Sequence, residues 1–93
     1  MINFAILHGK SMNVSRFMTF VLYEKADYRT GDIVCFRDLY GKKYCHRIVD
    51  IREINNLIYL TMKGDCMQKS MPFEINVPLE NIEGKVTWSY PKI

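Results

Sequence analysis

The sequence predicts a mainly β domain, folded as a curled antiparallel sheet or a partly open barrel. Short apolar runs rich in branched and aromatic residues recur along the chain, and turn-forming residues separate them. No window keeps the 3.6-residue apolar period of an amphipathic helix for more than two turns. The chain has 93 residues, which is enough for one modest core. We therefore expect a single β domain over residues 1–93.

The expected elements follow one another with short connections. Turns are predicted where glycine, aspartate and asparagine gather, because these residues adopt the backbone conformations that turns require. A hairpin is expected around the second of these turns, and the next strand should pair with the one before it. The strands are predicted at 2–7, 17–23, 33–37, 43–51, 57–63 and 83–89, the turns at 29–32, 39–42, 55–56 and 79–82, and a loop at 66–78.

Composition and charge exclude several classes of protein. The formal net charge is +3, and the lysines and arginines are scattered from Lys10 to Lys92 without the basic stripe of a nucleic-acid protein. No apolar run approaches the roughly 18–20 residues of a transmembrane helix. Residues 2–7 lack the basic region and the cleavage site of a signal peptide. We expect a protein of the cytoplasm or one that associates peripherally with a membrane; the sequence does not fix its oligomeric state.

The cysteines point to neither a disulfide framework nor a zinc site. There are three, at Cys35, Cys45 and Cys66, and the odd count argues against a closed set of disulfides. No Cys-x-x-Cys pair is present, so a zinc site is not expected. No metal ligand and no cofactor are predicted. Cys35 and Cys45 fall inside apolar runs and are expected to act as small core residues, a pattern that suits a reducing compartment.

Two short segments carry residue types that suit nucleophilic catalysis. Ser11 follows an apolar strand within Gly-Lys-Ser-Met, and His46 lies in the middle of a predicted strand. A hydroxyl becomes a useful nucleophile only when a base takes its proton, and histidine is the usual base near neutral pH. Each residue also has an ordinary interpretation. Ser11 can be a turn serine, and His46 can be a hydrogen-bonded core residue.

The motifs around these residues occur in an order that resembles a known family. They are Ser-Met after a glycine, then Gly-Asp-Ile-Val-Cys-Phe-Arg, His-Arg-Ile-Val-Asp-Ile, Tyr-Leu-Thr-Met-Lys-Gly-Asp and Ile-Glu-Gly-Lys-Val. In this order they resemble the catalytic domain of the type I signal peptidases and of the related LexA-type self-cleaving repressors. The resemblance covers residues 9–86.

The resemblance implies a serine peptidase with the curled sheet of that family. It makes Ser11 the nucleophile, with its own N–H in the oxyanion hole, and His46 the general base. It assigns Asp65 as the carboxylate that assists the histidine. Histidine in place of lysine is similar to the endoplasmic-reticulum-type and archaeal-type members. The implied substrate is an extended peptide or a precursor protein, and no cofactor is implied.

The chain also departs from the pattern of the family. Val14 stands where a proline is common, and the loop after Asp65 lacks a second aspartate, so that Glu74 is its nearest carboxylate. These differences motivate a second hypothesis, a catalytically inactive peptide-binding module of the same fold. A third hypothesis is a small barrel that binds single-stranded nucleic acid on its aromatic residues and lysines.

Three further residues near the motifs receive simpler interpretations. His8 is a rival base, but its position three residues before Ser11 on an extended chain would point it the wrong way. Asp32 is expected to bond across its own turn. Arg47 is expected to form an ion pair that supports the scaffold.

Overall fold

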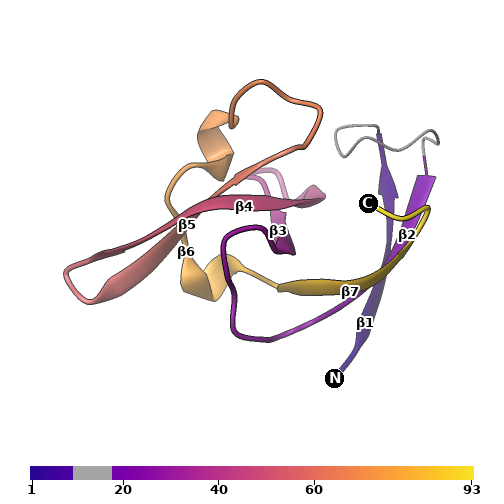
Figure 1. Cartoon of the computed structure of the whole chain (residues 1–93), viewed down its shortest axis with the longest axis horizontal. Coiled ribbons are helices and arrows are strands. Elements are labelled where there is room, and N and C mark those ends of the chain that lie inside the picture. Colours follow the sequence, from indigo (N-terminus) through magenta and orange to yellow (C-terminus); the bar gives the residue numbers. More distant parts are fainter. Residues whose placement is uncertain (10–17) are drawn as a thin grey trace.

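The computed structural model describes residues 1–9 and 18–93, which form one open antiparallel sheet of seven strands (Figure 1). The strand order is β1-β2-β7-β3-β4-β5-β6, so β1 and β6 are the two edges. The mainly β prediction is confirmed, and the sheet does not close. The elements are β1 (Asn3–His8), β2 (Met18–Glu24), β3 (Ile33–Arg37), β4 (Lys43–Ile54), β5 (Leu57–Lys63), η1 (Pro72–Glu74), β6 (Val77–Pro78), η2 (Leu79–Asn81) and β7 (Gly84–Tyr90).

The predicted strands all appear, and the differences lie at their ends and in one loop. β4 runs to Ile54, three residues beyond its predicted end at Ile51. Asn55 and Asn56 then turn the chain with φ of 53° and 65°, the conformation expected for asparagine in a tight hairpin. The predicted loop at 66–78 holds the short helix η1 and the two-residue strand β6. Residue 17, the predicted first residue of the second strand, lies outside the described residues.

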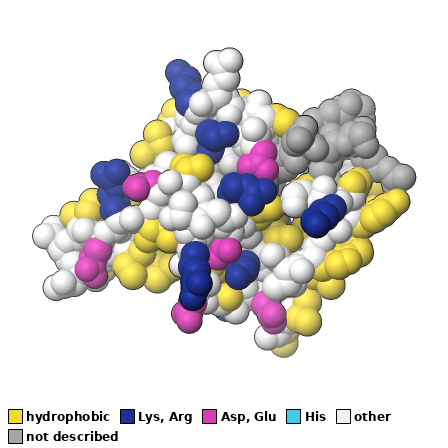
Figure 2. Space-filling view, viewed as in Figure 1, with side chains coloured by type: hydrophobic (Ala, Val, Ile, Leu, Met, Phe, Trp, Pro, Cys, Tyr) yellow, Lys and Arg dark blue, Asp and Glu magenta, His cyan; other side chains and the backbone are white. Residues whose placement is uncertain are grey.

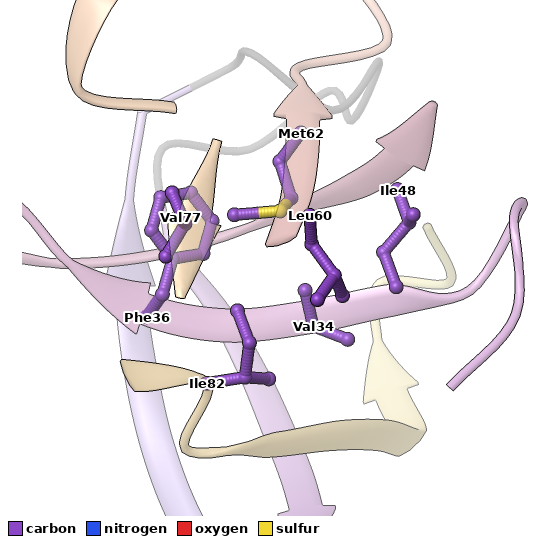
Figure 3. Packing of buried hydrophobic residues seen from close by; sticks show 7 residues of the cluster. All are labelled: Val34, Phe36, Ile48, Leu60, Met62, Val77 and Ile82. Atoms are coloured by element: carbon purple, nitrogen blue, oxygen red, sulfur yellow. The ribbon is translucent and has the colours of Figure 1, made fainter. Parts of the chain in front are cut away.

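Two apolar clusters cover the two faces of the central strands. Residues alternate across a strand, so the unbroken apolar run of β3 supplies both clusters. Val34 and Phe36 belong to the first cluster, while Ile33 and Cys35 belong to the second. Burial on both faces explains why β3 reads as continuous apolar sequence. The first cluster, shown in Figure 3, contains Val34, Phe36, Ile48, Leu60, Met62, Val77 and Ile82; the second contains Val21, Tyr23, Ile33, Cys35 and Cys45.

The structure corrects the expectation for two of the cysteines. Cys35 and Cys45 lie directly opposite each other in the register of β3 and β4, with their Cα atoms 4.2 Å apart, and they form a disulfide. They are buried, as expected for core residues, but they are not free thiols. Cys66 is the free cysteine and is exposed. Sequence spacing could not reveal the bond, because it depends on the register of the hairpin.

Gly84 allows β7 to enter the sheet between β2 and β3. It lies opposite Cys35, and a Cβ atom at this position would stand 2.8 Å from Tyr23 Cδ2 and 2.9 Å from the backbone carbonyl carbon of Glu24. Such contacts are too short for any side chain. This close approach gives a physical reason for the glycine of the Ile-Glu-Gly-Lys-Val motif.

The described part of the chain contains no helix that could cross a lipid bilayer.

Candidate active site

His46 is a buried histidine in the middle of β4. Only 6% of its side chain is exposed, and it packs edge-on against two aromatic rings. The ring centroids of Tyr44 and Phe36 lie 5.5 Å and 6.1 Å from that of His46. Tyr44 and Ile48 contribute to the first cluster and Cys45 to the second, as the alternation of β4 predicts. His46 therefore stands on the side of β4 that faces the first cluster.

A buried carboxylate meets this histidine from a different part of the chain. Nδ1 of His46 lies 2.5 Å from Oε2 of Glu74, whose side chain has no exposed surface. Glu74 is the last residue of η1, and its other oxygen accepts the backbone N–H of Met71 at 3.1 Å. Pro72 begins this single helical turn, because proline fixes a helical φ and needs no N–H partner there. The short helix η1 therefore positions the carboxylate of Glu74 against the ring of His46.

The pair sets the chemistry of the imidazole. An ionised carboxylate can only accept hydrogen bonds, so opposite an ionised Glu74 the proton of this contact lies on Nδ1 of His46, and the lone pair of an uncharged ring lies on Nε2. A proton taken up at Nε2 gives an imidazolium beside a carboxylate, which stabilises the new charge. This is the arrangement of a general base whose ring is held by a carboxylate.

Asp65, the carboxylate that the resemblance pairs with the histidine, binds Arg47, the neighbour of His46 in β4. Its two oxygens accept hydrogen bonds from Arg47 Nε and Nη2 at 2.9 Å and 2.8 Å. This bond holds the pKa of Asp65 below its usual range and raises the pKa of Arg47; burial opposes both shifts. The charge of His46 is the smallest of the influences that lower the pKa of Asp65. Asp65 is therefore close enough for the charge of His46 to affect its pKa, but the carboxylate that contacts Nδ1 of His46 is that of Glu74.

The remaining sequence interpretations can be placed on the same sheet. Arg47 forms the expected scaffold ion pair and also donates to the Gly31 carbonyl at 2.8 Å. Asp32 accepts the N–H of Arg29 across its turn at 2.8 Å, also as expected. His8 ends β1 on its exposed side, opposite Met18.

Ser11 and Val14 lie outside the described residues. The nearest described part of β1 does lie against the strand of the histidine. Leu7 precedes Ser11 by four residues and packs on the second cluster, which contains Cys45, the neighbour of His46. This cluster lies on the face of β4 opposite to the side chain of His46.

Glu74 is the functional candidate that the motifs did not single out. It appeared in the sequence only as the nearest carboxylate after Asp65. The local signal was Pro-Phe-Glu, a proline followed two residues later by an acid, which is typical of a first helical turn. Nothing local indicates that this acid is buried, because its burial depends on where the loop folds against β4.

Comparison with known proteins gave no match: no family model, no curated protein and no solved structure is significantly similar to this chain. The site and the order of the motifs are therefore the features that bear on function.

The buried pair predicts a large loss of stability on replacement of Glu74 by leucine. Glu74→Leu removes the carboxylate that contacts the buried Nδ1 of His46 and that accepts the N–H of Met71, which should cost about 2–4 kcal/mol in the free energy of unfolding. Urea denaturation measures this loss. Glu80→Leu is the matched control, because Glu80 lies in η2 and is exposed. A loss for Glu74→Leu no larger than that of the control would contradict the pairing.

The Arg47–Asp65 bond predicts a dependence of stability on acid pH. Folding lowers the pKa of Asp65, so ionised Asp65 stabilises the folded state. This stabilisation is fully present above the pKa of the unfolded chain, near 4, and is lost as the pH falls through the lower pKa of the folded state. Asp65→Asn should therefore flatten the fall of stability below about pH 4. Urea midpoints measured from pH 7 to pH 2.5 test this. Unchanged acid dependence in Asp65→Asn would show that the bond does not contribute.

Proposed function

We propose that this chain is a serine peptidase that cleaves an extended peptide or a precursor protein. In this proposal Ser11 is the nucleophile, His46 the general base and Glu74 the carboxylate that orients the base. The observation that carries the proposal is the 2.5 Å contact between His46 Nδ1 and the buried oxygen of Glu74. Glu74 takes the role that the family resemblance gave to Asp65.

The reaction follows from this arrangement. Nε2 of His46 takes the proton of the Ser11 hydroxyl as Oγ attacks the peptide carbonyl, and Glu74 stabilises the imidazolium. The imidazolium then gives its proton to the leaving amine as the C–N bond breaks. Water hydrolyses the acyl-enzyme in a second step, with His46 again acting as base. A base of this kind contributes about 10²–10⁴ to the rate.

The edge strand β1 suits the binding of an extended peptide. One side of β1 pairs with β2, and no described strand pairs with its other side. A peptide can add to such an edge through main-chain hydrogen bonds. β1 ends at His8, three residues before Ser11, so a peptide along this edge would run toward the proposed nucleophile.

Each of these motifs lies at the start, centre or end of a strand of the one antiparallel sheet, which supports our proposal of a fold of the signal peptidase and LexA type. The Gly-Asp-Ile-Val motif spans the start of β3, and the histidine motif occupies the centre of β4. The Lys-Gly-Asp motif ends β5, and the Gly-Lys-Val motif starts β7.

A groove favours the second hypothesis, a peptide-binding module without turnover. A groove of about 660 Å³ lies between the β3–β4 turn and the segment from η1 to η2. Its lining includes Leu39, Tyr40, Phe73 and Ile75. Phe73 packs on Tyr44 with ring centroids 4.9 Å apart, and Tyr44 packs in turn on His46. The groove therefore offers apolar contact to a peptide without requiring catalysis.

A fluorophosphonate probe tests the peptidase proposal without knowledge of the substrate. The wild-type protein should be labelled on Ser11, and Ser11→Ala should not be labelled. His46→Ala and Glu74→Gln should slow labelling by about 10²–10⁴-fold, because the base is lost or misoriented. Asp65→Asn is the matched control and should label within about tenfold of wild type. Circular dichroism confirms the fold of each variant.

Labelling of folded Ser11→Ala at the wild-type rate would contradict the nucleophile. Equal labelling of Glu74→Gln and wild type, with Asp65→Asn slowed, would return the role of the carboxylate to Asp65. Absence of labelling together with specific peptide binding in the groove would establish the module without turnover.

A further inference from the structure

A buried disulfide joins the two strands β3 and β4 at the centre of the sheet. Cys35 and Cys45 lie directly opposite each other and are ten residues apart in the sequence. Their Cα atoms are 4.2 Å apart, near the spacing of about 4.5 Å in the antiparallel pairs whose side chains approach most closely. The register of a single hairpin therefore brings the two sulfur atoms together.

Local hydrogen bonds fix the turn of this hairpin. Oδ1 of Asp38 accepts the backbone N–H groups of Tyr40 and Lys42, each at 2.9 Å. The backbone N–H of Asp38 donates to the carbonyl of Lys42 at 3.0 Å, and Gly41 has a φ of 83°, which glycine adopts without strain. A short loop also closes at a lower entropic cost than a long one. The hairpin can therefore pair its two cysteines before the more distant strands join the sheet.

In the folded protein the disulfide is closed to solvent. Cys35 is 0% exposed and Cys45 is 2% exposed. The strands that cover them are remote in the sequence, and β1 contacts β4 across the curl of the sheet although three strands separate them in the strand order. β1 and β2 lie together at the right of Figure 1, and Figure 2 shows hydrophobic side chains along the same rim. The cover of the two cysteines includes Ala5, Leu7, Val21, Tyr23, Val86 and Ile93.

We propose that a disulfide-containing oxidant forms the Cys35–Cys45 bond in the β3–β4 hairpin, before β1, β2 and β7 cover it. The thiolate of one cysteine attacks the disulfide of the oxidant, which gives a mixed disulfide and releases one oxidant sulfur. The second cysteine thiolate attacks the protein sulfur of the mixed disulfide and releases the other oxidant sulfur. The oxidant gains two electrons, its sulfurs take up the two thiol protons, and both leave as thiols.

The third cysteine is the competitor in this reaction. Cys66 lies beyond the end of β5, so a loop that joins it to either of the other cysteines is longer than the hairpin loop. In the folded protein Cys66 is exposed and is a free thiol. The hairpin therefore selects the Cys35–Cys45 pair, and Cys66 stays reduced.

This oxidation step is suited to an oxidising compartment. A reducing cytosol keeps protein thiols reduced, whereas stable disulfides are typical of exported proteins. The bond thus replaces the reducing compartment that the sequence predicted. It does not depend on the peptidase chemistry, although Cys45 is the neighbour of His46 and the bond fixes the strand of the proposed base to β3.

Thiol alkylation followed by mass spectrometry tests the bond and its cover. The full chain is reduced in urea and refolded with oxidised and reduced glutathione. The product should contain the Cys35–Cys45 bond, and iodoacetamide should modify Cys66 alone. Dithiothreitol should then reduce the bond at least about 100-fold more slowly in native buffer than in urea, because the core strands that cover it open rarely. Formation and reduction pass through the same uncovered hairpin, so this ratio reports on the order of the steps.

Two variants separate the bond from the free thiol. The double variant Cys35→Ala and Cys45→Ala loses the constraint of the hairpin loop, which should raise the equilibrium constant of unfolding at least about 100-fold. Urea denaturation measures this change. Cys66→Ala is the matched control and should unfold as wild type does, because the exposed thiol of Cys66 forms no disulfide.

The thiols can also be trapped with N-ethylmaleimide in the intact cells that naturally make the chain, where the Cys35–Cys45 bond should already be present. Four outcomes would overturn the proposal. They are a refolded protein with three free thiols, a bond that includes Cys66, equal rates of reduction in native buffer and in urea, and three trapped thiols in the intact cells. The last of these would show that the chain matures in a reducing compartment.

Discussion

The hydrogen bond between His46 and Glu74 is the constraint on which the organisation of the site depends. A carboxylate with no exposed surface costs several kcal/mol unless partners replace its water. Here Nδ1 of His46, 2.5 Å from one oxygen of Glu74, and the N–H of Met71, which donates to the other oxygen, fill that role. The connection from β5 to β6 can therefore fold against the sheet only where these donors meet Glu74. The geometry of the imidazole and the position of η1 follow from one interaction.

Two adjacent residues of β4 bind the two ends of the segment from Asp65 to Glu74. His46 points to the first cluster and binds η1, while Arg47 points the other way and binds Asp65 near the end of β5. Arg47 also reaches the carbonyl of Gly31, which joins the turn before β3 to the same site. The alternation of a single strand thus fixes the segment between Asp65 and Glu74. The histidine-arginine motif therefore binds the segment between β5 and β6 to the sheet, and it also contains the proposed catalytic base.

The sequence predicted the strands well, because alternation and branched residues report on each strand locally. It ended β4 three residues early, because the last residues of this long hairpin are exposed and lack an apolar pattern. The disulfide and the burial of Glu74 both depend on contacts between distant segments, which no local pattern encodes. Asp65 was assigned from the order of the motifs, and that order says nothing about which carboxylate turns toward Nδ1.

The protonation state of His46 tests this account most directly. Nitrogen NMR of the histidine rings at neutral pH distinguishes a neutral ring with its proton on Nδ1 from a neutral ring with its proton on Nε2 and from an imidazolium. The account predicts that the neutral form of the His46 ring carries its proton on Nδ1, and that Glu74→Gln weakens this preference. A neutral ring that carries its proton on Nε2 would contradict the role of His46 as a base held by Glu74.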